Sequence, residues 1–201
     1  MPVDFLFSSS HIIKDFPYHH VLVIGSPGSG KSTLSRKLGD ILDLPVIHLD
    51  LLWHLPDQTT VSEEVFDKRL MTELNKPCWI IDGNFLRTVP LRLEKADLVL
   101  FLDYPAALCE ESVEERIGKP RLDLPWIEQS FDPEFRIFIQ EFPIIRRPAI
   151  LDLLSKVNPA KTTVVQLTSR EEADQFMDLL KELTTKAVSN PCRRSEKEII
   201  D

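Results

Sequence analysis

The sequence is poor in cysteine and has no long hydrophobic run. Its three cysteines, Cys78, Cys109 and Cys192, form no C-x-x-C pair and have no histidine nearby at zinc-ligand spacing, which argues against a zinc or dithiol motif. We expect them to be the reduced thiols of a cytoplasmic protein. No segment approaches the roughly 18 apolar residues of a membrane-spanning helix, so we expect no membrane partner. An early Asp4 and the short apolar run at residues 5–7 argue against a secretory signal peptide.

Basic residues are also in deficit. The 24 Lys and Arg residues against 32 Asp and Glu residues give a formal net charge of −8. Because nucleic-acid binding depends on phosphate neutralisation, this charge argues against a general nucleic-acid coat, although it leaves a local basic site open. The 201 residues, 43% of them hydrophobic, are enough for one α/β domain with a sizeable core and too few for two domains of ordinary size.

Glycine is scarce, and three of the six glycines lie within residues 25–30. The short apolar run at residues 21–24 is typical of a buried strand. It is followed by G-x-x-x-x-G-K-S and then by an amphipathic helical pattern, which is the context that a P-loop requires. A glycine-rich turn without a ligand is the alternative, and the Lys31-Ser32 ending together with both flanks favours the P-loop.

This P-loop predicts binding of ATP and Mg²⁺. Its glycines let consecutive backbone N–H groups turn inward around a phosphate. The helix N-terminus and Lys31 add positive charge, and Ser32 offers a hydroxyl to Mg²⁺. The predicted nucleotide-binding residues are Gly25, Ser26, Pro27, Gly28, Ser29, Gly30, Lys31, Ser32 and Thr33.

Strand and helix patterns alternate along the rest of the chain. Further strands are predicted at residues 45–50, 78–81, 97–103 and 162–167. This alternation predicts a three-layer P-loop NTPase fold of the α/β class, with a five-stranded parallel sheet and helices on both faces. Thr60 and Glu63 have the spacing of a capping box for one helix, and Pro143 and Pro148 should divide another that begins near Glu134.

We divide the chain into three parts. Residues 1–19 form an N-terminal extension whose apolar residues are expected on the domain surface, namely Phe5, Phe7, Ile12 and Phe16. Residues 20–188 form the P-loop domain. It includes an acceptor-binding segment at about 50–76 and a short lid at about 117–133, where charge and proline replace helical periodicity. Residues 189–201 are polar, which predicts a disordered tail.

Polar residues follow several predicted strands, at the edge where ligands bind in parallel α/β sheets. Asp82 is predicted to be the carboxylate on the Mg²⁺ side, acting through water, or else a cap of the next helix. Asp50 is predicted to bind an acceptor hydroxyl or act as its base, or else to be an N-cap. A histidine such as His48 is more often a hydrogen-bonded structural residue than a catalyst. Trp53 could stack on a ligand ring or pack in the core.

Arginines are expected to bring charge to the transferring phosphate. Arg87, five residues beyond Asp82, should point back over the site from the start of its helix. The basic residues around the lid are Arg116, Lys119, Arg121, Arg146 and Arg147. Although most exposed arginines have no specific role, such a cluster in so acidic a chain predicts a closing lid. Our candidate catalytic set is Lys31, Asp50, Asp82, Arg87, Arg116, Arg121 and Arg146, with Ser32 and Asp82 as metal ligands.

The ordered motifs GSPGSGKST, HLDLLW, WIIDGNF with Arg87, and ADLVLFLD resemble the bacterial P-loop kinases labelled DNA topology modulation protein, relatives of adenylate kinase. The resemblance covers roughly residues 21–180. In the adenylate-kinase-like relatives, the Asp of a D-G-x-x-x-R motif lies near the metal and its Arg holds the acceptor phosphate. Asp82, Gly83 and Arg87 match this motif loosely, because D-G-N-F-L-R has one residue more before the arginine.

A second resemblance is to shikimate and gluconate kinases. It rests on the nineteen-residue step from Lys31 to Asp50 and on Asp82-Gly83-Asn84 at the place of a glycine-rich turn. Those kinases use an Asp at the position of Asp50 to hold acceptor hydroxyls. Here His48 stands where they have a metal-side Asp. The short lid also resembles these small kinases.

Together these features predict an ATP- and Mg²⁺-dependent phosphotransferase. Its expected partners are ATP or ADP and a small-molecule acceptor, with a nucleotide or nucleoside favoured. A hydroxyl acceptor of the shikimate or gluconate type is the alternative. A nucleotide-gated regulator that contacts DNA and a simple ATPase are further alternatives. A monomer and a homodimer are both compatible with the sequence.

Overall fold

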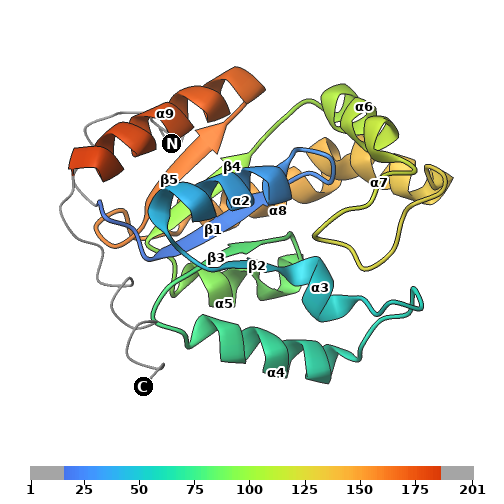
Figure 1. Cartoon of the computed structure of the whole chain (residues 1–201), viewed down its shortest axis with the longest axis horizontal. Helices are drawn as coiled ribbons and strands as arrows, with labels where there is room; N and C mark the ends of the chain where they lie inside the picture. The colour runs from blue at the N-terminus through green and yellow to red at the C-terminus, as the bar shows by residue number, and fades with distance from the viewer. Residues whose placement is uncertain (1–15, 187–201) are drawn as a thin grey trace.

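The computed structural model describes residues 16–186 and consists of one parallel sheet with helices on both faces (Figure 1). The five strands are β1 (His20–Gly25), β2 (Val46–His48), β3 (Trp79–Asp82), β4 (Leu98–Leu102) and β5 (Thr163–Leu167). Their order across the sheet is β2-β3-β1-β4-β5. The predicted five-stranded parallel sheet is therefore confirmed, with β1 between β3 and β4.

Helical segments connect the strands. The α-helices are α2 (Lys31–Leu42), α3 (Leu49–Trp53), α4 (Glu63–Leu74), α5 (Val89–Leu93), α6 (Ala106–Arg116), α7 (Pro133–Glu141), α8 (Arg147–Ser155) and α9 (Arg170–Lys186). A 3-10 turn, η1 (Leu86–Thr88), precedes α5. A π-helical turn, η2 (Phe142–Arg146), joins α7 to α8. Figure 1 shows α4 and α5 on the side of the sheet opposite to α9.

Two apolar cores lie on the two faces of the sheet, because successive side chains of a strand point in opposite directions. Val21 and Val23 of β1 belong to the core that includes side chains of α2, α6 and α9. Leu22 and Ile24 belong to the core that includes side chains of α4 and α8. All four are fully buried. Each face is thus covered by apolar helices, which gives the predicted three layers.

Element boundaries differ from the prediction by one residue at several strand ends and by more at two places. The predicted second strand stops at His48, and Asp50 lies in the first turn of α3. Helix α4 has Ser62 as its N-cap, whose Oγ accepts the Val65 N–H at 3.4 Å, so the capping box expected at Thr60 is wrong. The expected division of the helix that carries two prolines is confirmed, because η2 separates α7 from α8.

The cysteines differ in state. Cys109 of α6 is free and buried. Cys78 is disulfide-bonded, so the expectation of a reduced thiol is wrong at this position. Cys192 lies outside the described residues, as do the tail and the predicted surface contacts of Phe5, Phe7 and Ile12. Within residues 16–186, helices of the length and apolar character needed to cross a membrane are absent.

Candidate active site

The P-loop leaves the carboxyl end of β1 and leads into α2. Gly25 has φ +152° and Gly28 has φ +80°, a region that favours glycine. A Cβ at Gly25 would lie 2.4 Å from the carbonyl oxygen of Leu102, and one at Gly28 would lie 2.2 Å from that of Cys109. Backbone of β4 and α6 therefore closes on the loop from two sides, and a side chain at either glycine would displace it.

Lys31, the first residue of α2, turns its ammonium back to the loop. Its Nζ donates to the carbonyl oxygens of Gly25 at 3.0 Å and Ser26 at 2.9 Å. Burial lowers the pKa of Lys31, while the carboxylates of Asp50 and Asp82 oppose this shift. The ammonium thus lies within electrostatic reach of the predicted acceptor-side and metal-side carboxylates.

His48 and Asp82 lie side by side, because they are register partners at the ends of β2 and β3. The Nδ1 atom of His48 is 2.7 Å from Oδ2 of Asp82, and both side chains are buried. Burial lowers the pKa of His48, but the hydrogen bond and the charge of Asp82 outweigh it and leave the pKa raised. Asp82 does not cap the next helix, since the N-cap of η1 is Phe85 and has no side-chain cap hydrogen bond.

Asp50 lies in the first turn of α3, at the start of the predicted acceptor-binding segment. The N-cap of α3 is His48, so the alternative interpretation of Asp50 as an N-cap is wrong. Burial raises the pKa of Asp50; the charge of Lys31 opposes this shift and that of Asp82 adds to it. A half-buried carboxylate with a raised pKa beside an ammonium has properties that suit a group exchanging a proton with an acceptor hydroxyl.

Sequence reasoning placed Asn84 at the strand ends without giving it a role, and it missed Arg92, which binds the turn that contains Asn84. The Oδ1 atom of Asn84 accepts the Gly25 N–H at 3.0 Å. Arg92 of α5 is fully buried and donates to the carbonyl oxygen of Gly83 at 2.7 Å. The only sequence signal for Arg92 was its place inside the apolar stretch V-P-L-R-L. That signal is weak, because amphipathic helices commonly carry an arginine at an exposed position beside apolar residues.

Arg87, which we expected to point back over the site, is held in an ion pair. Its guanidinium donates two hydrogen bonds to the carboxylate of Asp67 on α4, at 3.0 and 2.8 Å. This pair is solvent-exposed and links η1 to the acceptor-binding segment. The local sequence does not reveal this acidic partner, which α4 places beside Arg87.

The predicted lid, between α6 and α7, holds its arginines in ion pairs. Arg121 contacts Asp123 at 2.6 Å and Glu128 at 2.8 Å, and Arg116 contacts the same Glu128 at 2.9 Å. Burial tends to raise the pKa of Asp123, but hydrogen bonds from Arg121 and the Ser32 hydroxyl hold it well below its usual range. Asp123 thus joins the lid to the first turn of α2, a link that sequence reasoning missed.

The remaining arginines of the candidate site lie at the junction of η2 and α8. The Arg146 guanidinium lies 3.6 Å from the ring centroid of Phe138, and its Nη1 is buried without a hydrogen-bond partner. Arg147 instead binds the carboxylate of Asp103, at the end of β4, with distances of 2.8 and 2.9 Å. The structure therefore separates two adjacent arginines, of which only Arg147 is held by a carboxylate here.

Hard oxygen donors around the first turn of α2 fit Mg²⁺, which prefers a few carboxylates together with water and substrate phosphates. The Ser32 hydroxyl lies there beside Asp123, and the charge of Asp82 acts on the neighbouring Lys31. Among residues 16–186, clusters of three or more His, Cys, Asp or Glu side chains that could hold a metal by themselves are absent. A metal here would thus depend on nucleotide oxygens as well as on protein groups.

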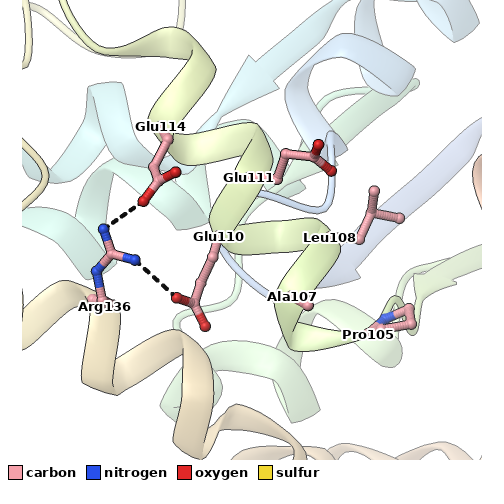
Figure 2. A pocket seen from close by; sticks show the side chains of 7 residues that line it. All are labelled: Pro105, Ala107, Leu108, Glu110, Glu111, Glu114 and Arg136. Carbon is pink, nitrogen blue, oxygen red and sulfur yellow. Dashed lines mark hydrogen bonds and ion pairs between the residues drawn. The ribbon is translucent and has the colours of Figure 1, made fainter.

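A surface pocket of about 620 Å³ lies elsewhere, along α6. Figure 2 shows Arg136 of α7 between Glu110 and Glu114, with Pro105 and Leu108 farther along the wall. The two ion pairs measure 3.1 and 2.6 Å. This pocket contains none of the residues at the strand ends, so we place the candidate active site at the P-loop and not here.

The central β1, the P-loop and the parallel order of the sheet define a three-layer α/β P-loop NTPase fold. No family model and no curated protein matches the chain. Shikimate kinase from Acinetobacter baumannii in complex with shikimate is similar over 88% of this chain and 99% of that chain, with TM-score 0.56 and 16% identity. Shikimate kinase from Bacteroides thetaiotaomicron is similar over 84% and 99%, with TM-score 0.53 and 17% identity. The likeness lies in the fold.

Proposed function

We propose that this protein is an ATP- and Mg²⁺-dependent kinase that phosphorylates a small molecule. The observation that carries the proposal is the position of Lys31. Its ammonium contacts the loop expected to hold the donor phosphates, and it lies within the electrostatic influence of Asp50, in the first turn of α3, and of Asp82, at the end of β3. A donor site and an acceptor-side carboxylate that interact with one cation are among the parts that phosphoryl transfer requires.

Each residue has a proposed role. The backbone N–H groups of the P-loop and Lys31 bind the ATP phosphates. Ser32, Asp82 and Asp123 hold Mg²⁺, directly or through water, and the metal would neutralise charge on the phosphates. Asp50 orients an acceptor hydroxyl and accepts its proton. Arg116 and Arg121 exchange their lid carboxylates for the transferring phosphate as the lid closes.

The acceptor is proposed to be a nucleotide or nucleoside. Supporting this, the half-buried rings of Trp53 and Phe85 pack on the buried ring of Phe66, with centroids 4.7–5.9 Å apart, and Trp53 belongs to the same short helix as Asp50. The accessible parts of Trp53 and Phe85 offer an apolar face to a planar base. In this proposal Arg87 and Arg146 bind the acceptor's phosphate, the first after leaving its exposed pair with Asp67.

A hydroxyl acceptor of the shikimate or gluconate type is the second candidate. The similar structure from Acinetobacter baumannii contains shikimate. The segment between α6 and α7 of this chain, the proposed lid, is short. The relation to the DNA topology modulation proteins rests on the motifs alone. Under that relation a nucleotide-gated regulator is a further possibility, and its DNA binding should weaken steeply with salt.

A panel of acceptors with labelled ATP tests the proposal. Nucleoside monophosphates, nucleosides, shikimate and gluconate are offered to the wild type and to Lys31→Ala. Transfer to one class by the wild type alone would support a kinase and name the acceptor. Release of inorganic phosphate at the same rate with and without every acceptor would favour a simple ATPase. If neither transfer nor hydrolysis occurs, the kinase proposal is wrong.

A further inference from the structure

We propose that Arg92 is a positioning residue for the P-loop, acting through the turn at residues 83–85 and the side chain of Asn84. In this arrangement Arg92 fixes the turn, and Asn84 holds the backbone of Gly25, the first residue of the loop. Any effect on ATP binding rests on the proposed nucleotide site. The positioning itself can be measured without nucleotide.

Both terminal nitrogens of Arg92 donate to the backbone of this turn, while its Nε donates to the carbonyl oxygen of Thr88 at 3.4 Å. Its Nη1 donates to the carbonyl oxygen of Gly83 at 2.7 Å, and its Nη2 donates to those of Asn84 and Phe85, the latter at 3.2 Å. The side chain is fully buried, and burial lowers its pKa to about 9. One guanidinium thus binds three consecutive carbonyl groups.

The turn needs such support, because its backbone is unusual. Gly83 has φ +128°, and Phe85, which is not a glycine, has φ +29°. Residues with side chains rarely adopt positive φ, and they do so only where their surroundings hold them. A planar guanidinium with its donors in a fixed fork is well suited to hold several carbonyls at once.

Two hydrogen bonds connect the turn to the end of β1. Asn84 Oδ1 accepts the Gly25 N–H at 3.0 Å, and the Gly83 N–H donates to the Val23 carbonyl at 3.2 Å. The carbonyl oxygen of Gly25 in turn accepts a hydrogen bond from Lys31 Nζ at 3.0 Å. A continuous series of contacts therefore runs from Arg92 through Asn84 and Gly25 to Lys31.

The same turn also borders the acceptor side. A Cβ at Gly83 would lie 2.8 Å from Cβ of Leu49, which begins α3. Phe85 packs against Phe66 and Trp53 with centroids 4.7 and 5.9 Å away. Displacement of the turn would consequently disturb the residues around Asp50 as well as the P-loop. Arg92 thus acts on both ends of the site without touching either substrate.

The first experiment is a double-mutant cycle on the affinity for MgATP, measured by calorimetry. The variants are Arg92→Met, Asn84→Ala and both together, with the exposed Arg136→Met as a matched control. Each single change should weaken binding about 5- to 10-fold, as expected for one lost hydrogen bond. The double variant should bind MgATP as tightly as the more strongly impaired single variant does, because Arg92 acts through Asn84. Arg136→Met should bind as the wild type does.

The positioning role would be overturned if the loss of MgATP affinity in the double variant equalled the product of the two single losses. It would also be overturned if the single variants bound MgATP as tightly as the wild type. If the wild type itself does not bind MgATP, the proposed function fails, and the double-mutant cycle then has no binding affinity to compare. The two failures are therefore distinguishable.

The second experiment needs no nucleotide and does not depend on the folding of an Arg92 variant. Amide hydrogen exchange of Gly25 is measured in the wild type, Asn84→Ala and Asn84→Asp. The alanine variant should exchange about tenfold faster at Gly25, while amides of β4 remain unchanged. The aspartate variant keeps the acceptor oxygen and should keep the protection. Equal exchange at Gly25 in all three proteins would show that Asn84 does not hold the loop.

Discussion

The Nδ1 atom of His48 lies 2.7 Å from Oδ2 of Asp82, and both side chains are buried at adjacent strand ends. The proposed metal-side carboxylate therefore already has a partner whose charge depends on pH. With His48 protonated, the pair is an ion pair beside Lys31. With His48 neutral, Asp82 keeps a hydrogen bond and is freer to interact with a metal.

His48→Gln should remove the pH dependence that this pair adds to stability. Because the pKa of His48 is raised in the folded protein, its stabilising effect is fully present below the unfolded value of about 6.5 and is lost as pH rises through the folded pKa. Thermal unfolding from pH 5 to 9 should show the wild type losing its advantage over His48→Gln on the alkaline side. Parallel curves would rule out this linkage.

Lys31→Ala should weaken ATP binding about 10- to 100-fold, since a hydrogen bond to a charged group contributes about 1.5–3 kcal/mol. The ligand-free fold should persist, because the two carbonyls that Lys31 releases can bind water. Calorimetric titration with MgATP and a thermal scan measure both quantities. Lys37→Ala, an exposed lysine of the same helix paired weakly with Asp174 at 3.7 Å, should bind ATP normally. A large drop in Tm for Lys31→Ala would make this lysine structural.

Asp50→Asn should impair acceptor use far more than ATP binding. A positioned general base contributes about 10²- to 10⁴-fold, so kcat/KM for the acceptor should fall within that range while the Kd for ATP stays within about twofold. Burial raises the pKa of Asp50, so wild-type activity should begin to fall at a pH above the ordinary aspartate range. Asp178→Asn, on the exposed face of α9, is the control. Equal losses for both substrates would contradict the assignment.

Asp123→Asn should loosen the lid, because Arg121 loses one of its two carboxylate partners. Trypsin should cleave after Arg121 about tenfold faster if local opening becomes easier by about 1.4 kcal/mol. The depressed pKa of Asp123 means that its stabilising effect is present above the unfolded value of about 3.9 and lost as pH falls through the folded pKa. Glu115→Gln on the exposed face of α6 is the control. Unchanged cleavage would place the restraint elsewhere in the loop.

Local sequence was enough to predict the sheet and the P-loop. Residues 21–24 and 98–102 are so apolar that only buried strands accommodate them, and β1 and β4 are buried there. The order of strand, glycine-rich loop and helix likewise depends on neighbours in the chain. Such features are local, and they can be predicted without knowing which elements pack against them.

Side-chain partners across the chain were not predictable in the same way. Arg87 and Asp67 are separated by 20 residues, and their pairing depends on how α4 lies against η1. Arg92 follows a helical pattern that is usually exposed, and it is buried because the turn at residues 83–85 presents carbonyls to it. Asp123 reaches Ser32 only because the lid folds onto α2.

The contact between Gly28 and α6 has a consequence for how this sequence can diverge. Position 28 is a variable position of the G-x-x-x-x-G-K-S motif, yet a methyl group there would overlap the Cys109 carbonyl oxygen. Descendants of this protein that acquire alanine at position 28 must therefore also shift α6, through changes near residue 109. The two positions, 81 residues apart in the chain, should covary, and an alignment that ignored α6 would misjudge glycine 28 as replaceable.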